Sequence, residues 1–324
     1  MRELIALALF ASCAPAPAPI APAQQAVGVR TFDAVDPVSH TAMPMAVFYP
    51  ALGSAAHAQF GPYDVAAGKD LPARAGSFPL VVISHGHGGS QWGHHDLAEV
   101  LAAHGYVVAT LEHPGDNYRD QSGFRSDRVL FGRAYQVSAA IDAVLADPTL
   151  HVDPKRVGVA GFSAGGWTSL LVAGAHPDLG QIDAYCTRHS DDVEICGGPL
   201  RHELASVSPT VDPRVRAAFV MAPFAVAFAP DAFREVTAPV FLAWGAADQV
   251  LLPDENARAI RPHLATLRGT REVPNAGHYV FLTPCPAAIA HELATICKDP
   301  PGVDRAAVHR ELASDAIAFF DASL

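Results

Sequence analysis

The sequence VGVAGFSAGG, residues 157–166, joins an apolar strand pattern to a Gly-x-Ser-x-Gly turn, and a helical segment at 167–173 follows it. This order of strand, turn and helix is what a nucleophile elbow requires, in which a sharp turn exposes the serine hydroxyl. Gly161 and Gly165 suit such a turn, because a Cβ at either position would collide with neighbouring backbone. We therefore predict that Ser163 is a nucleophile. The alternative is an ordinary Gly-rich turn between a strand and a helix.

Apolar segments of strand length alternate with helical segments on both sides of this turn. The unbroken apolar run at 79–84 is typical of a strand buried on both faces of a parallel sheet. The alternation predicts an α/β fold with a mostly parallel central sheet wrapped by helices. We expect strands at 27–34, 45–49, 79–84, 106–111, 156–160, 216–221, 240–244 and 271–273, and helices at 95–104, 129–145, 167–173, 255–267 and 306–320.

Three segments interrupt this pattern. Residues 51–78 are rich in Gly, Ala and Pro and predict a long connection, whereas the polar and charged residues 113–128 predict a surface loop. Residues 176–213 are also polar and contain Cys186 and Cys196. We predict that 176–213 is an insertion that lies like a small cap over the site.

The bulk composition limits the class of protein. Half of the 324 residues are hydrophobic, so residues 24–324 can bury the core of one large domain. The chain has 22 Lys and Arg against 33 Asp and Glu, which gives a formal net charge of −11. Because no basic run is present, the sequence argues against a nucleic-acid partner.

The first 23 residues are expected to form an export segment. Residues 4–11 are an apolar run too short to span a bilayer. The run resembles a secretory signal, and the residues ending at Cys13 resemble a lipoprotein lipobox. Two outcomes stay open: a lipid on Cys13 that anchors the protein to a membrane, or plain cleavage within the Ala/Pro run 14–23, an extended linker either way. The protein would then be periplasmic, lipid-anchored or secreted.

The other four cysteines fall into two close pairs, Cys186 with Cys196 and Cys285 with Cys297. Four cysteines allow three connectivities. Pairing between neighbours is the simplest, because each pair brackets a short segment, and two disulfides suit an exported protein. Four buried free thiols are the alternative.

A serine nucleophile needs a neutral imidazole as its base and a carboxylate to orient that imidazole. In this architecture both should follow the serine in the order acid, histidine, each just past a strand end. Asp248 follows the strand expected at 240–244, and His278 follows the strand expected at 271–273. We predict Asp248 as the orienting acid and His278 as the base. Asp248 could instead cap the next helix, although Asp254 is better placed for that role.

The oxyanion of an acyl-transfer reaction needs two hydrogen-bond donors. We predict that the Ala164 amide, next to the nucleophile, is one donor. The loop SHGHGGS at 84–90 follows an early buried strand, and its His87 amide is the candidate for the second. We expect His85 to form hydrogen bonds within this loop. The rival interpretation is a zinc site formed by clustered histidines, here His85, His87, His94 and His95. No cysteine or carboxylate completes a familiar ligand spacing, so we predict no metal.

These motifs together resemble the α/β-hydrolase superfamily. The loop at 84–89, the segment LAAHGYVVA at 101–109 and the sequence EHPG at 112–115 are similar to bacterial proteins described as predicted dienelactone hydrolases and to platelet-activating-factor acetylhydrolases. The likeness covers most of residues 27–320, including the two cysteine pairs. It implies a carboxylic-ester hydrolase with no cofactor, with Ser163, His278 and Asp248 as its triad and with the His87 amide in the oxyanion hole.

Two departures limit what the resemblance implies. Dienelactone hydrolases use a cysteine where this chain has Ser163, and the acetylhydrolases place their acid after an earlier strand, which here ends at 221–224 without a carboxylate. The expected activity is therefore hydrolysis of a small-molecule ester, with short-acyl or lipid-like esters suggested. A catalytically idle binding protein, a metal-dependent hydrolase, and a hydrolase of amides or polyesters stay open as alternatives.

Overall fold

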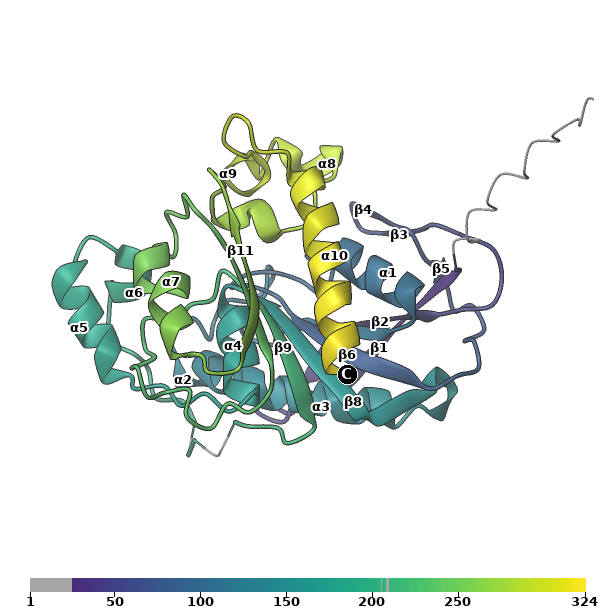
Figure 1. The fold of residues 1–324 in the computed structure, drawn as a ribbon, viewed down its shortest axis with the longest axis horizontal. Helices are drawn as coiled ribbons and strands as arrows, with labels where there is room; N and C mark the ends of the chain where they lie inside the picture. Colours follow the sequence, from purple (N-terminus) through teal and green to yellow (C-terminus); the bar gives the residue numbers. More distant parts are fainter. Residues whose placement is uncertain (1–24, 205, 208–209) are drawn as a thin grey trace, which may run out of the picture.

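A nine-stranded sheet forms the centre of the computed structural model, which describes residues 25–204, 206–207 and 210–324 (Figure 1). The order of its strands is β11-β10-β9-β8-β6-β7-β2-β1-β5, and β3 pairs with β4 in a separate ribbon. The strands are β1 (Val27–Val35), β2 (Ala42–Pro50), β3 (Ala58–Phe60), β4 (Tyr63–Val65), β5 (Gly68–Lys69), β6 (Phe78–Ser84), β7 (Val107–Leu111), β8 (Val152–Phe162), β9 (Val215–Met221), β10 (Val240–Gly245) and β11 (Leu267–Val273).

The pairing of these strands confirms the prediction of a mostly parallel sheet. The strands from β7 through β6, β8, β9 and β10 to β11 are parallel, and only β2 runs antiparallel to its neighbours β1 and β7. Parallel strands end at the same edge of a sheet, so the loops after β6, β8, β10 and β11 meet there.

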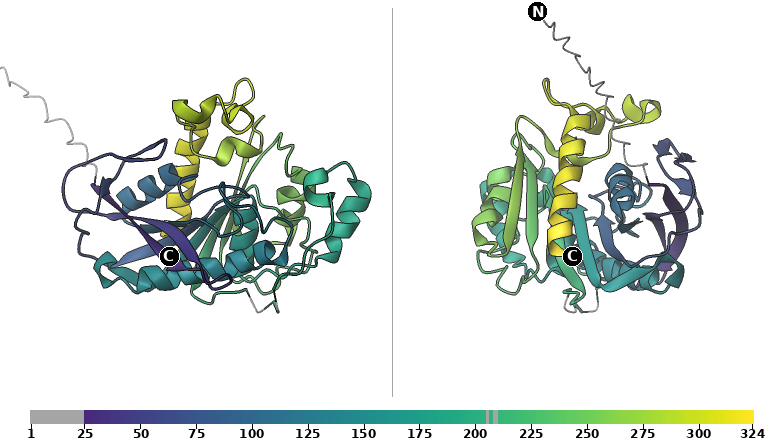
Figure 2. Two further views of the ribbon diagram at one scale, coloured as in Figure 1. Left: turned by 180° about the vertical axis from the view of Figure 1, so that it is seen from behind. Right: turned by 45° about the vertical axis from the view of Figure 1, so that its right-hand side comes forward.

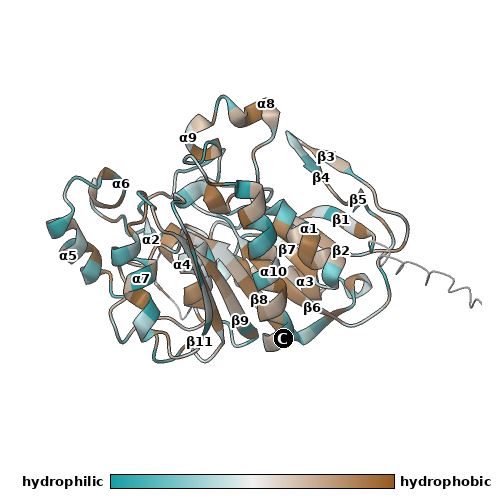
Figure 3. Ribbon diagram, turned by 45° about the horizontal axis from the view of Figure 1, so that its top comes forward, coloured by the Kyte–Doolittle hydropathy of each residue, from teal (hydrophilic) through white to brown (hydrophobic). Residues whose placement is uncertain are grey.

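Helices cover both faces of the sheet. In β6, Leu80 and Val82 pack into a core with α3 and α4, whereas Val81 and Ile83 pack into a second core with α1 and α10. Figure 2 shows α10 crossing one face of the sheet, and Figure 3 shows that the central strands are largely hydrophobic. The helices are α1 (His95–His104), α2 (Asp127–Leu130), α3 (Gly132–Leu145), α4 (Ala164–Val172), α5 (Gly180–Arg188), α6 (Val193–Cys196), α7 (Ala257–Ile260), α8 (Ala287–Ala290), α9 (Ala294–Cys297) and α10 (Arg305–Ser323).

The helix predicted at 255–267 is wrong. Its place is taken by a 3₁₀ turn at Pro253–Glu255, the short helix α7, and a second 3₁₀ turn at Arg261–His263. Pro262 has no backbone N–H and so cannot continue the α-helical hydrogen bonding. Asp254 lies inside the first turn, and the residue at the N-cap of α7 is Asn256.

The loop at 113–128 is only in part the surface loop that its composition predicts, because residues 118–122 are exposed whereas both of its ends are buried. Its residues His113, Asp116 and Ser126 are completely shielded from solvent, and Asp127 is nearly so. The predicted helix at 129–145 is in fact two, α2 and α3, and the predicted connection at 51–78 contains the short strands β3, β4 and β5.

The cysteine pairing confirms the neighbour prediction. Cys186 is bonded to Cys196 and Cys285 to Cys297. The first disulfide joins α5 to α6, which lie at one end of the molecule (Figure 1). Within the described ranges, no helix has the length and apolar character needed to cross a bilayer. The predicted export segment 1–23 and its Cys13 lie outside the described residues.

Candidate active site

Ser163 occupies a strained turn between β8 and α4. Its backbone has φ 56° and ψ −116°, a combination that side-chain-bearing residues rarely adopt. A Cβ on Gly161 would lie 2.0 Å from the Gly165 carbonyl oxygen, and one on Gly165 would lie 1.9 Å from the Ser84 carbonyl oxygen. The close approach expected at both glycines is therefore present, and it turns the serine away from the sheet.

The structure brings the three predicted triad residues together. The Ser163 hydroxyl lies 3.0 Å from Nε2 of His278, and Nδ1 of His278 lies 2.7 Å from Oδ2 of Asp248. Ser163 follows β8, Asp248 lies just beyond β10, and His278 lies beyond β11. Three loops distant along the chain thus place a hydroxyl, an imidazole and a carboxylate in one hydrogen-bonded row.

The imidazole and the carboxylate of this row are shielded from water. His278 is 4% exposed and Asp248 is 3% exposed, and the Phe162 ring packs 4.7 Å from the His278 ring. Oδ1 of Asp248 accepts hydrogen bonds from the amides of Val250 and Leu251. Asp248 therefore does not cap a helix; it holds its own loop with one oxygen and contacts His278 with the other.

The two residues predicted to supply the oxyanion donors line the same cavity as Ser163. Ala164 is the first residue of α4, so its amide has no acceptor within the helix. Ala164, His87 and Ser163 all line one cavity of about 460 Å³. Among the described residues, no backbone acceptor is bonded to the amide of Ala164 or of His87. Neither amide is thus committed to a backbone acceptor in the described part of the chain.

His85 hydrogen-bonds within its loop, as the sequence predicts. Its Nδ1 donates to the Gly86 carbonyl at 2.6 Å, and its Nε2 accepts from the His113 amide at 3.1 Å. Burial, together with the charge of Arg133, lowers the pKa of His85 to about 3, so the ring is neutral at physiological pH. A neutral ring with one donor and one acceptor suits these two contacts.

The four histidines at 85–95 have separate partners. Nδ1 of His87 contacts Asp116, and Nδ1 of His95 contacts Glu99 at 2.6 Å. His94 is buried against Phe162. Among the residues that the structure describes, no group of three or more His, Cys, Asp or Glu side chains is placed to hold a metal ion.

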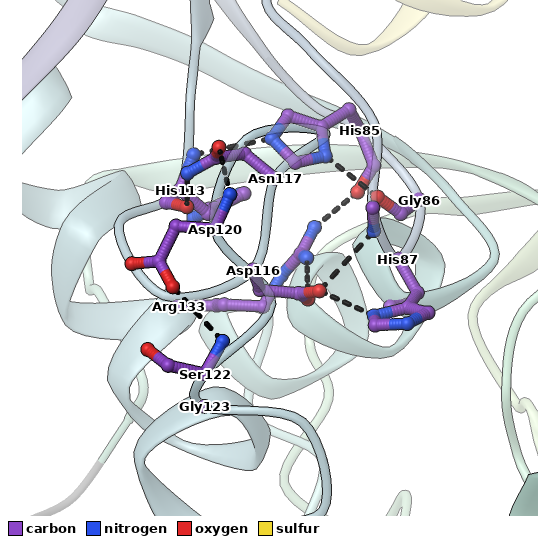
Figure 4. Close-up of polar contacts among 12 residues, drawn as sticks. His85, Gly86, His87, His113, Asp116, Asn117, Asp120, Ser122, Gly123 and Arg133 are labelled. Atoms are coloured by element: carbon purple, nitrogen blue, oxygen red, sulfur yellow. Dashed lines mark hydrogen bonds and ion pairs between the residues drawn. The ribbon is translucent and has the colours of Figure 1, made fainter.

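Behind the loop at 84–90 lies a buried polar network that the sequence analysis missed (Figure 4). Arg133 pairs with Asp116 and donates to the His85 carbonyl. Burial alone would raise the pKa of Asp116, but Arg133 and His87 outweigh it and hold the pKa well below its usual range. A signal was available, because Arg133 falls on the stripe of α3 that buries Val137, Ala140 and Val144.

The cavity beside Ser163 is mostly apolar at its walls. The predicted cap segment 176–213 supplies one wall, including the Cys186–Cys196 disulfide, and residues from 124 to 130, in α2 and just before it, supply another. Its apolar lining includes Phe124, Leu130, Ile182, Ile195, Leu200 and Phe224. An apolar cavity with a few polar groups at one end is typical of a small-molecule site.

Aromatic and basic residues close to the triad differ in whether they lie in the core or line the cavity. Trp167 and Phe162 are core residues, whereas Phe224 lines the cavity. Arg125 also lines it, and its guanidinium donates to the Glu194 carbonyl of α6 at 2.8 Å. This arginine is thus engaged in holding the predicted cap segment to the rest of the fold.

Comparison with solved structures shows the fold. A ferulic acid esterase from Streptomyces cinnamoneus superposes with a TM-score of 0.61 at 21% identity, over 95% of this chain and 92% of the esterase. The chain has the α/β-hydrolase fold. The family model of platelet-activating factor acetylhydrolase, isoform II, matches residues 47–128 of this chain. The family model of the prolyl oligopeptidase family matches residues 92–181. The resemblance to the acetylhydrolases is thereby confirmed for its N-terminal part.

Curated relatives of this α/β-hydrolase-fold chain match over shorter stretches. Cutinase 2 of Thermobifida cellulosilytica is 32% identical over 112 residues, which are 33% of this chain and 39% of the cutinase. An uncharacterized peptidase of Bacillus subtilis (strain 168) is 36% identical over 104 residues, 30% of this chain and 15% of the peptidase. The chain therefore spans well under half the length of the curated relatives it matches.

Proposed function

We propose that this chain is a serine hydrolase of carboxylic esters that works through an acyl-enzyme. The single observation that carries the proposal is the row of hydrogen bonds from Ser163 through His278 to Asp248. A hydroxyl bonded to a neutral imidazole, which is itself oriented by a carboxylate, is the arrangement that activates serine for attack on a carbonyl. The cutinase matches and the acetylhydrolase family model support esters as the substrates.

The geometry suggests the role of each residue. Nε2 of His278 takes the Ser163 proton as the oxygen attacks the ester carbonyl, and then gives it to the leaving alcohol. Asp248 keeps the proton of Nδ1 in place and stabilises the imidazolium. The amides of Ala164 and His87 receive the developing oxyanion. Water, activated by the same imidazole, then releases the acid.

Substitution of the nucleophile tests the proposal. We expect Ser163→Ala to lower kcat on a p-nitrophenyl ester by on the order of 10⁴- to 10⁶-fold, because among the described residues Ser163 is the hydroxyl that contacts Nε2 of His278. Ser54→Ala, at an exposed position outside the cavity, is the matched control and should retain wild-type activity. If Ser163→Ala keeps full activity, the proposal is refuted.

The acid product could also come from an amide, and one observation favours that second candidate. The prolyl oligopeptidase family model spans residues 92–181, which include Ser163. A matched panel of esters and anilides with one acyl group separates the two, and acyl groups of increasing length, a short-acyl phospholipid and an aromatic diester locate the preferred substrate. A wild-type protein that hydrolyses none of them and resists a fluorophosphonate probe would instead be a binding protein.

We also propose that the protein is exported. Two disulfides suit an oxidising compartment. The choice between a lipid on Cys13 and cleavage beyond it can be read by mass spectrometry of the mature N-terminus.

A further inference from the structure

Arg133 is a buried cation between the two halves of the proposed oxyanion hole. Its side chain is 1% exposed, although it lies in α3, which contributes no catalytic group to the proposed mechanism. A buried guanidinium is costly unless its donors are paired. The partners of Arg133 therefore show what the buried charge is retained to do.

One set of Arg133 contacts holds the loop that contains His87. Its guanidinium donates to the His85 carbonyl and, at 3.2 Å, to the Ser84 hydroxyl. It also pairs with Asp116, whose Oδ1 accepts from the Gly88 amide at 3.2 Å and contacts Nδ1 of His87 (Figure 4). The His85 carbonyl and the Gly88 amide, on either side of the His87 amide, are thus tied to Arg133 and Asp116, and among the described residues no backbone acceptor is bonded to the His87 amide itself.

Another Arg133 contact reaches α4, the helix that follows the nucleophile. Nε of Arg133 lies 3.3 Å from the Thr168 hydroxyl, and that hydroxyl donates to the Ala164 carbonyl at 2.8 Å. Ala164 is the residue whose amide is the other proposed oxyanion donor. One guanidinium therefore connects, through a single further side chain on each side, the residues that supply both donors.

We propose that Arg133 is the positioning residue of the oxyanion hole and that, with Asp116 and Thr168, it sets the separation between the His87 and Ala164 amides. The inference rests on the proposed function. It follows from geometry: two donors must lie 2.7–3.1 Å from one developing oxyanion, and a misplacement of about 1 Å can cost about 100-fold in rate. Arg133 does not line the cavity, so it acts only through these partners.

The test compares Arg133→Lys with the same substitution at a second buried arginine, Arg305. Lysine keeps the charge near Asp116, but its single ammonium cannot span the His85 carbonyl and the Thr168 hydroxyl together. We expect kcat on a p-nitrophenyl ester to fall about 10- to 100-fold, with KM changed less than about twofold. Arg305→Lys is the control, because Arg305 is also a buried arginine but, within the described part of the chain, its hydrogen bonds go to Asp299 and the Ile296 carbonyl, away from the proposed site.

A trifluoromethyl ketone provides the readout that loss of stability would not move. Its serine adduct places an anionic oxygen in the oxyanion hole, so its inhibition constant should weaken by the same factor as kcat/KM in each variant. Asp116→Asn weakens the contacts on the His87 side, and Thr168→Val removes the contact on the Ala164 side. Each should lower kcat/KM less than Arg133→Lys does, and the inhibition constant should again weaken by the same factor as kcat/KM. These two variants decide the matter if Arg133→Lys does not fold.

The outcomes separate the two proposals. The inference is overturned if the folded variants keep kcat within twofold, if KM carries the loss, or if Arg305→Lys loses as much activity. If the wild-type protein neither hydrolyses esters nor binds the ketone, it is the proposed function that fails.

Discussion

The two oxygens of Asp248 have different tasks, and this division decides what can replace the residue. Oδ1 accepts from two backbone amides, at 2.9 Å from Val250 and 2.8 Å from Leu251, whereas Oδ2 contacts Nδ1 of His278 at 2.7 Å. An asparagine can preserve the first task, because its carbonyl oxygen can accept both amides. It then presents an N–H to His278, which must turn Nδ1 into an acceptor.

We therefore expect Asp248→Asn to lower kcat by on the order of 10³- to 10⁴-fold with little loss of stability, because the imidazole adopts the wrong tautomer. Steady-state kinetics and thermal unfolding measure the two effects. Asp254→Asn is the control, since the Asp254 side chain is 82% exposed and forms its ion pair with Arg258 rather than with a triad residue. A variant that unfolds instead of losing rate would show that Asp248 serves mainly to hold its loop.

The helices α5 and α6 form a wall of the cavity that has few ties to the sheet. The Cys186–Cys196 disulfide joins them, and the Arg188 and His189 side chains contact Glu255 at 2.7 and 3.0 Å. The Cys285–Cys297 disulfide bridges a segment of similar length but does not line the cavity. The two bridges thus form a natural pair for comparison.

Replacing both cysteines of the first bridge by serine should change substrate preference. We expect Cys186→Ser/Cys196→Ser to raise KM for long-acyl esters more than for acetyl esters, because the cavity wall loosens while the triad keeps its supports. Each bridge stabilises the fold by at most about 3 kcal/mol, so Cys285→Ser/Cys297→Ser matches the cost in stability. Equal KM profiles in the two variants would contradict a role for α5 and α6 in substrate binding.

Three fully buried histidines make the folded protein sensitive to acid. Burial lowers the pKa of His85 to about 3 and that of His94 to about 4, and it lowers that of His113 well below its usual value. Below about pH 6.5 the unfolded chain binds protons that the folded chain refuses, so stability falls as the pH falls. Asp116, whose pKa is depressed, contributes a loss only in more acidic solution.

We expect the free energy of unfolding to fall between pH 6.5 and 4.5, by up to about 1.4 kcal/mol per pH unit for each of these histidines. The variant His94→Asn removes one titrating group and should flatten the slope by about one proton in denaturant titrations across this range. Ser54→Ala, at an exposed position, changes no titrating group and should leave the slope unchanged. An unaltered slope in His94→Asn would show that His94 is not held neutral by the fold.

Local pattern was enough to predict the parts of this protein that neighbouring residues encode. The turn at Ser163 depends on two glycines within two positions of it, and alternating apolar runs are sufficient to predict a parallel sheet with Asp248 and His278 after its strands. The pairing of neighbouring cysteines is equally local. Pro262, which ends the helix expected at 255–267, was also visible in the sequence.

The support behind the site is different, because its meaning depends on partners far along the chain. Arg133 meets Asp116 and the His85 carbonyl across 17 and 48 positions, so a charge that composition assigns to the surface becomes a buried tie once the fold has closed. The buried residues of the polar loop at 113–128, among them His113, Asp116 and Ser126, are shielded for the same reason. A charged side chain can leave water at tolerable cost only where other groups replace its hydration, and for Arg133 those groups come from distant parts of the chain, which no short stretch of residues records.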